Sequence, residues 1–277
     1  MDIDVLGTLA VRHNRVSITP TAPKPRQVLA LLALRADQVV PVGVLAEELW
    51  GAKPPRSARA TLQTYILQLR ELITAALENG TGDDTGQRRL AKDVLLTVPA
   101  GYLLKGDDGT SDVREFERLA GSGYRAMDAE DYPRAARLLR EALGLWTGPA
   151  LADVRTGPHL QTEANRLAES RLCALDQRVE ADLRLGRHRE LLAELTVLVN
   201  QYPTHESLCG QFMLALYRSG RRGEALDAYQ RLRSTLVRTM GLEPSSALGK
   251  LQRSILMSGP GPLPGRSAAD LSAAPVA

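Results

Sequence analysis

A helical pattern of apolar residues dominates the stretch from Arg56 to Leu77. The apolar positions recur at steps of four, three, four and four, and they are Leu62, Ile66, Leu69, Ile73 and Leu77. On a helix this spacing puts them on one stripe, which must face a core to be sheltered from water. We therefore expect a long amphipathic helix whose apolar face packs on the rest of its domain.

The opposite face of this helix carries hydrogen-bonding side chains and cations. Counting 100° per residue, it holds Ala60, Thr61, Thr64, Leu67, Gln68 and Glu71, with Arg59, Gln63 and Arg70 along one edge and Tyr65 along the other. Between Gly51 and Arg70 the chain has four cations, Lys53, Arg56, Arg59 and Arg70, and no acid. Such a face suits phosphates at its edges and base edges at its centre. The alternative is an ordinary solvated helix that happens to be basic.

The length and the charge distribution of the chain indicate two domains, the first of them basic. A chain of 277 residues exceeds the usual single domain of about 100 to 200 residues, so two domains are expected. The net charge is +3, and residues 1–105 hold 13 Lys and Arg against 10 Asp and Glu, which leaves 22 of each for the remainder. The whole basic excess therefore lies in the N-terminal part.

The sequence shows no sign of export or of a membrane span. It begins with the acids of Met1-Asp2-Ile3-Asp4 instead of a basic leader, and its densest apolar run, 28–34, is too short to cross a bilayer. The two cysteines, Cys173 and Cys209, form no CxxC pattern. We expect a soluble cytoplasmic protein with neither a disulfide framework nor a zinc site.

The start of the chain predicts a small antiparallel platform followed by a helix. Apolar residues are frequent in 3–11 and again in 16–18, with His13-Asn14-Arg15 as the turn between two short strands. A largely apolar helix is expected to begin at Pro25 and to end near Asp37.

A second, shorter helix precedes the long one. It is expected from about Gly43 to Trp50, where Gly51 stops it. The stiff connector Lys53-Pro54-Pro55 follows, and Ser57 is placed to cap the start of the long helix. These residues therefore predict a helix-turn-helix.

Two β-prone runs follow the long helix. They are Val94 to Val98 and Tyr102 to Leu104, joined by the turn Pro99-Ala100-Gly101, and they predict a hairpin. A hairpin directly behind a helix-turn-helix is the wing of a winged helix. The ordered set of platform, three helices and wing is more specific than a helix-turn-helix alone. Residues 1–105 are therefore predicted to be a winged helix-turn-helix DNA-binding domain.

Beyond an expected linker at 106–111, helical periodicity is continuous. Three segments align as an internal repeat, at 129–135, 185–191 and 219–225. Gly186 and Gly220 are 34 residues apart, which is the tetratricopeptide period. Such repeats stack helix pairs and leave a concave surface for a partner.

The second domain is therefore predicted to be an all-α, tetratricopeptide-like domain at 111–258. An insertion is expected in it near Trp146 to His159, and residues 259–277, rich in Pro, Gly, Ser and Ala, are expected to be a disordered tail. The predicted fold class is mainly α: an α+β winged helix domain followed by helical repeats.

Enzymatic chemistry finds little support in the sequence. The four histidines are scattered, at His13, His159, His188 and His205, and no catalytic pair can be proposed from them. The nearest approach to a GxxxxGK[ST] nucleotide site is Gly249-Lys250-Leu251, which has Leu after Lys and Pro244 in place of the first Gly. We therefore predict no enzyme, no catalytic residues, no metal and no cofactor.

Four strings carry a family resemblance: PRQVLALLAL, LAEELWG, TLQTYILQLR and TVPAGYLL. The order of elements resembles the OmpR-type winged helix, and the strings are similar to those of the Streptomyces antibiotic regulatory protein family, bacterial activators of secondary-metabolite gene clusters. The resemblance extends over the chain to about Ser258. It implies that the helical domain is a bacterial transcriptional activation domain.

The resemblance also implies roles for particular residues. In OmpR-type domains the long helix enters the major groove, which implies base contacts by Thr64, Tyr65 and Gln68 and a phosphate contact by Arg70. Thr97 and Tyr102 match phosphate-contacting positions of the wing. The basic face adds three further candidates to the DNA-binding set, and they are Arg56, Arg59 and Thr61.

Two residues depart from the family pattern at positions that recognise DNA bases. The basic residue that such wings often insert into the minor groove is matched here by Pro99, so the wing lacks the side chain that would read the minor groove. Gln68 stands where Arg is frequent, and since Gln favours adenine and Arg favours guanine, the preferred bases are expected to differ.

The function implied by the resemblance is activation of an antibiotic gene cluster. Two copies are expected head to tail on direct repeats near a promoter's −35 element, in the cytoplasm at the nucleoid, recruiting RNA polymerase holoenzyme through its sigma factor. Lys24 and Arg26 are the candidate polymerase contacts. The alternative is a tetratricopeptide adaptor whose basic N-terminal domain binds protein instead of double-stranded DNA.

Overall fold

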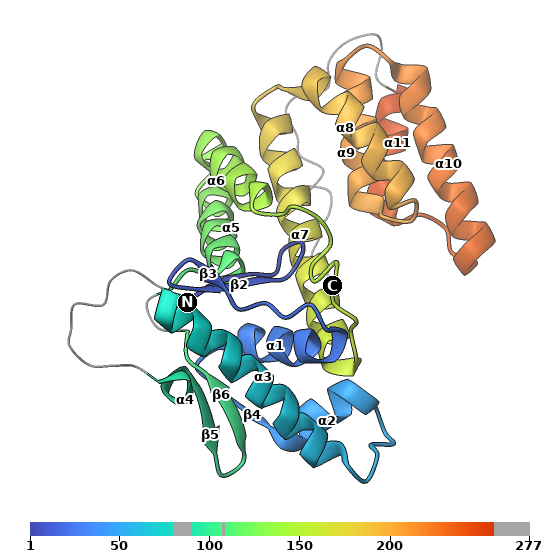
Figure 1. The fold of residues 1–277 in the computed structure, drawn as a ribbon. Coiled ribbons are helices and arrows are strands. Elements are labelled where there is room, and N and C mark those ends of the chain that lie inside the picture. Colours follow the sequence, from blue (N-terminus) through green and yellow to red (C-terminus); the bar gives the residue numbers. More distant parts are fainter. Residues whose placement is uncertain (80–89, 107–108, 258–277) are drawn as a thin grey trace. The chain divides into compact units, whose positions relative to one another are not determined.

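The structure, a computed structural model, describes residues 1–79, 90–106 and 109–257, which form two compact units (Figure 1). The first unit is built from residues 1–119 and 141–172, and the second from 120–140 and from the chain after residue 172. The predicted tail at 259–277 lies outside the described residues.

A three-stranded antiparallel sheet opens the first unit. It joins β1 (Asp2–Asp4), β2 (Ala10–His13) and β3 (Val16–Ser17) in that order. The predicted platform is confirmed, but the first apolar run forms two strands instead of one. The turn between β2 and β3 lies where it was predicted, with Asn14 and Arg15 both at positive φ.

The helices and the second sheet of this unit follow. The helices are α1 (Pro23–Leu34), α2 (Val42–Trp50), α3 (Ala58–Asn79) and α4 (Ala91–Val94). The second sheet has the order β4-β6-β5, from β4 (Val39–Pro41), β5 (Leu95–Val98) and β6 (Gly101–Leu104). Strand β4 is additional to the strands predicted from the sequence. Gly101 permits its pairing with β6, since a Cβ there would lie 2.0 Å from the carbonyl oxygen of Val40.

The apolar stripe of α3 faces the core of the first unit. Leu62, Ile66, Leu69 and Ile73 are all buried, as the spacing predicted. The last position differs, because Ala76 is fully buried while Leu77 is only half-buried. The stripe packs with the buried residues of α1, so these two helices hold the helix-turn-helix together.

The segment expected as an insertion packs on the connection between β1 and β2. The backbone N–H groups of Thr147 and Leu151 donate to the carbonyls of Leu6 and Val5, both at 2.9 Å. Gly7 allows this close approach, because a Cβ there would lie 1.9 Å from Oγ1 of Thr147. Residues 141–172 therefore belong to the same compact unit as the winged helix.

A buried carboxylate fixes the start of α7 (Pro158–Arg184) on α2. Glu48 is 2% exposed, and its Oε1 accepts hydrogen bonds from Gln27 Nε2 at 2.9 Å and from the Gly157 N–H at 2.6 Å. Its Oε2 accepts the N–H groups of His159 at 2.9 Å and Leu160 at 3.0 Å. These N–H groups at a helix start have no intrahelical acceptor, and the carboxylate supplies one.

The second unit is helical in its described residues. Its helices are α8 (His188–Gln201), α9 (Glu206–Arg218), α10 (Arg222–Met240) and α11 (Ser246–Met257), while α5 (Asp112–Asp128), α6 (Tyr132–Gly144) and α7 contribute residues to both units. The predicted repeat is confirmed, because its three segments form the turns within three successive helix pairs. Their matching residues, Glu130, Gly186 and Gly220, all adopt positive φ.

The compact units divide the chain elsewhere than at the expected linker. The described residues around it are bonded to the N-terminus: Ile3 N–H donates to the Thr110 carbonyl at 2.9 Å, and the N-terminal ammonium of Met1 donates to the Gly106 carbonyl at 3.1 Å. The division into 1–105 and 111–258 stays a prediction. Within the described residues, none of the helices is both long and apolar enough to span a bilayer.

Candidate nucleic-acid interface

The face of α3 opposite the core is open to solvent. Thr64 and Gln68 are exposed, Thr61 and Tyr65 are half-buried, and Glu71 is exposed one turn further along. The Thr64 hydroxyl donates to the Ala60 carbonyl at 3.2 Å, which fixes its rotamer and leaves its oxygen free to accept a hydrogen bond. The side chains predicted to meet bases are thus presented together on one face.

Cations cluster at the N-terminal end of this face. Lys53, Arg56 and Arg59 are all exposed, and none has an ion pair within the part of the chain that the structure describes. They lie on the connector and on the first turn of α3. Because no internal ion pair has to break first, these cations can bind phosphate groups with little loss of free energy.

Arg70 has an internal role that its sequence position did not reveal. Its Nε and Nη2 donate to the Leu95 carbonyl at 3.1 and 2.8 Å, and Nη2 also donates to Thr97 Oγ1 at 2.8 Å. These bonds tie α3 to β5. Neither N–H group of Nη1 has an acceptor among the residues that the structure describes, so one guanidinium can hold the wing and still meet a phosphate.

The two candidate residues of the wing differ in exposure. Thr97 and Tyr102 are opposite each other in the β5–β6 register. Thr97 is exposed, whereas Tyr102 is 7% exposed and belongs to the buried core. The ring of Tyr102 thus anchors the hairpin, and the exposed surface of the hairpin comes from Thr97, Pro99 and Ala100.

The two candidate polymerase contacts at the start of α1 also differ. Arg26 forms an ion pair with Asp153 and donates to the carbonyls of Pro20 and Leu9, both at 3.1 Å. Lys24 places its Nζ 4.9 Å from the centre of the Trp50 ring. Arg26 therefore holds internal structure together, while Lys24 keeps its charge near the surface.

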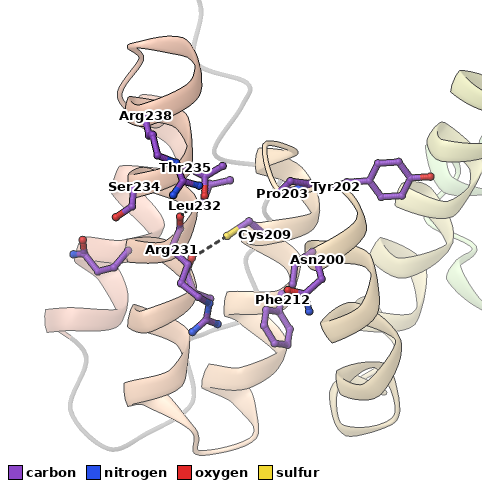
Figure 2. A pocket seen from close by; sticks show the side chains of 13 residues that line it. Asn200, Tyr202, Pro203, Cys209, Phe212, Arg231, Leu232, Ser234, Thr235 and Arg238 are labelled. Atoms are coloured by element: carbon purple, nitrogen blue, oxygen red, sulfur yellow. Dashed lines mark hydrogen bonds between the residues drawn. The ribbon is translucent and has the colours of Figure 1, made fainter.

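A separate hollow lies in the second unit. It has a volume of about 460 Å³ and is lined by residues from the end of α8, from α9 and from α10, among them Asn200, Phe212 and Arg231 (Figure 2). Cys209 contributes a thiol whose pKa burial raises to about 12, so it stays protonated at neutral pH. None of the predicted site residues lies in this hollow.

Among the described residues, no group of three or more His, Cys, Asp or Glu side chains lies close enough together to hold a metal ion. His159 instead lies 3.0 Å from Glu47, and His205 accepts the Leu208 N–H at the start of α9 through Nδ1 at 3.3 Å.

Two protein families match the chain, one in each part. Residues 13–81 match the family described as transcriptional regulatory protein, C terminal. Residues 111–256 match the bacterial transcriptional activator domain. The first match contains the helix-turn-helix and the second contains the helix pairs.

Individual relatives are similar over nearly the whole chain. The regulatory protein DnrI of Streptomyces peucetius is 52% identical over 264 residues, which cover 94% of each chain. The regulatory protein AfsR of Streptomyces coelicolor is 37% identical over 98% of this chain, although the match spans 25% of its own length. The solved structure of Mycobacterium tuberculosis EmbR in complex with a low affinity phosphopeptide superposes with a TM-score of 0.83. It is 31% identical and is matched over 98% of this chain and 67% of that one.

Proposed function

Because this chain belongs to the Streptomyces antibiotic regulatory protein family of transcriptional regulators, we propose that it activates a secondary-metabolite gene cluster by placing α3 in the major groove of a promoter. One observation carries the proposal. The apolar stripe of α3 is buried, and this leaves Thr64 and Gln68 on an exposed face, preceded by exposed cations that have no ion pair among the described residues. A polar centre flanked by cations is what a base-reading helix needs.

The roles divide between the centre and the edges of this face. Thr64, Tyr65 and Gln68 contact bases, with Gln68 paired to adenine through its amide. Phosphate contacts come from Arg56 and Arg59, assisted by residues that include Thr61, Arg70 and Thr97. Tyr102 supports the wing from the core, so its contribution to DNA binding is indirect.

On the promoter we propose two copies head to tail on direct repeats near the −35 element. Each copy would recruit RNA polymerase through its sigma factor at the nucleoid. Lys24 is the better of the two candidate contacts, because Arg26 is engaged by Asp153. Transcription in vitro by Lys24→Ala should fall while DNA binding is kept; undiminished transcription would refute this contact.

A salt titration of binding to a promoter fragment tests the function. Phosphate contacts by Arg56, Arg59 and Arg70 release counterions, so log affinity should fall against log salt with a slope of about −2.7 per bound copy. Replacing Arg59 by Ala should reduce this slope by about 1. Binding without salt dependence, or no binding to any fragment of the cluster's promoters, would instead favour the protein-binding adaptor.

A further inference from the structure

One apolar side chain stands in the middle of the polar face of α3. Leu67 is 57% exposed, and within the described part of α3 it is the one large apolar side chain that is mostly in solvent. Its neighbours one turn away are the exposed Gln63, Thr64 and Glu71. Internal packing does not account for Leu67, because the core lies on the other side of the helix.

The chemistry of the major groove offers one partner for such a side chain. Every base edge there carries hydrogen-bond donors or acceptors, and thymine alone adds an apolar group, its C5 methyl. Leucine has no donor or acceptor, so against a polar edge it would remove water and return no hydrogen bond. Against a methyl group, both surfaces gain from leaving water.

We infer that Leu67 contacts the C5 methyl of a thymine and selects thymine at one position of each bound half-site. The inference rests on the proposed function and deepens it. Thr64 and Gln68 flank Leu67 on the same face and would read the polar edges of neighbouring bases, while Leu67 reads the methyl.

Deoxyuridine substitution tests this contact, because deoxyuridine lacks the methyl and keeps every hydrogen-bonding group of thymine. The probe is a promoter duplex that the full chain protects in a footprint, with each thymine of the protected site replaced singly. For the unmodified protein, one position per half-site should lose about threefold to tenfold in affinity, the effect of one buried methyl. The Leu67→Ala variant should bind the thymine duplex weaker by a similar factor and should be indifferent, within about twofold, to deoxyuridine at that position.

Two control variants separate this contact from other causes. Leu242→Ala truncates a leucine of matching exposure, 58%, outside α3, and should leave both affinity and methyl sensitivity unchanged. Thr64→Ser removes the exposed methyl one turn before Leu67 and should keep the Leu67-dependent position sensitive. The truncation at Leu67 removes no core contact, so the fold should be kept.

The inference is overturned if Leu67→Ala keeps the same deoxyuridine sensitivity as the unmodified protein. It is also overturned if removing any thymine methyl leaves the affinity of both proteins unchanged. Salt-dependent binding with no methyl effect would refute Leu67 alone and leave the proposed function standing. Failure to bind any promoter duplex would refute the proposed function itself.

Discussion

Replacing Glu48 by Gln should loosen the start of α7 although the side chain keeps its size. In the native carboxylate each oxygen accepts two hydrogen bonds: Oε1 from Gln27 and Gly157, and Oε2 from His159 and Leu160. A glutamine has one oxygen and one NH₂ group. Whichever way the amide is turned, its NH₂ faces two N–H donors, and both of those lose their acceptor.

The size of the effect follows from this count. A buried donor left without an acceptor costs about 1 to 3 kcal/mol, so two of them cost about 2 to 6 kcal/mol. Loss of the negative charge at the N-terminus of α7 adds to this, since the helix dipole favours an anion there. We expect a loss of about 3 kcal/mol in local stability.

Amide hydrogen exchange at Gly157, His159 and Leu160 measures this loss directly. It reports the local opening free energy, which is better defined in a chain of two compact units than one global unfolding value. Glu47→Gln is the matched control, because Glu47 is exposed and its contact with His159 should be worth less than about 1 kcal/mol. Equal protection in the two variants would refute the account of Glu48.

Two further predictions concern other buried or shared polar groups. Arg70→Lys keeps the charge but loses the forked bonds to Leu95 and Thr97, so it should weaken DNA binding with a nearly unchanged salt slope. Arg70→Ala should weaken binding and also flatten the salt slope by about 1. Identical salt slopes for the two variants would refute the double role of Arg70. Burial raises the pKa of the Asp112 carboxyl above its ordinary value of 3.8, against the N–H groups of Val5 and Leu6 that lower it. Because the folded pKa is the higher one, this contribution to stability is complete below about pH 3.8 and is lost as pH rises through the folded pKa. Urea unfolding midpoints should therefore fall over that window and fall less in Asp112→Asn; parallel curves would contradict this.

Periodicity predicted the elements that depend on local pattern. The stripe of α3 had to be buried once its spacing was helical, and the three repeat turns had to match because each closes a helix pair. The exposure of Thr64 and Gln68 follows from the same stripe, since they lie on its far side.

Contacts between distant residues were beyond such reasoning. The pairing of β4 with β6 depends on a close approach at Gly101, and the bonds of Thr147 to the Leu6 carbonyl join residues 141 positions apart. Arg70 was predicted at an edge of α3, but spacing could not reveal that it bonds to Leu95 and Thr97. The exposure of Leu67 could be predicted from the sequence, because it is a large apolar residue on the face predicted to be polar.

Base-substitution binding with Gln68→Ala tests most directly whether α3 reads DNA. Each base pair of a protected half-site is changed to the three alternatives, and affinities are measured at one fixed salt concentration. The unmodified protein should discriminate at one base pair by about 1 to 3 kcal/mol, and Gln68→Ala should lose that preference at this pair alone. If Gln68→Ala keeps the preference at every pair, or weakens all sequences equally as Arg59→Ala should, the exposed face of α3 does not read the bases.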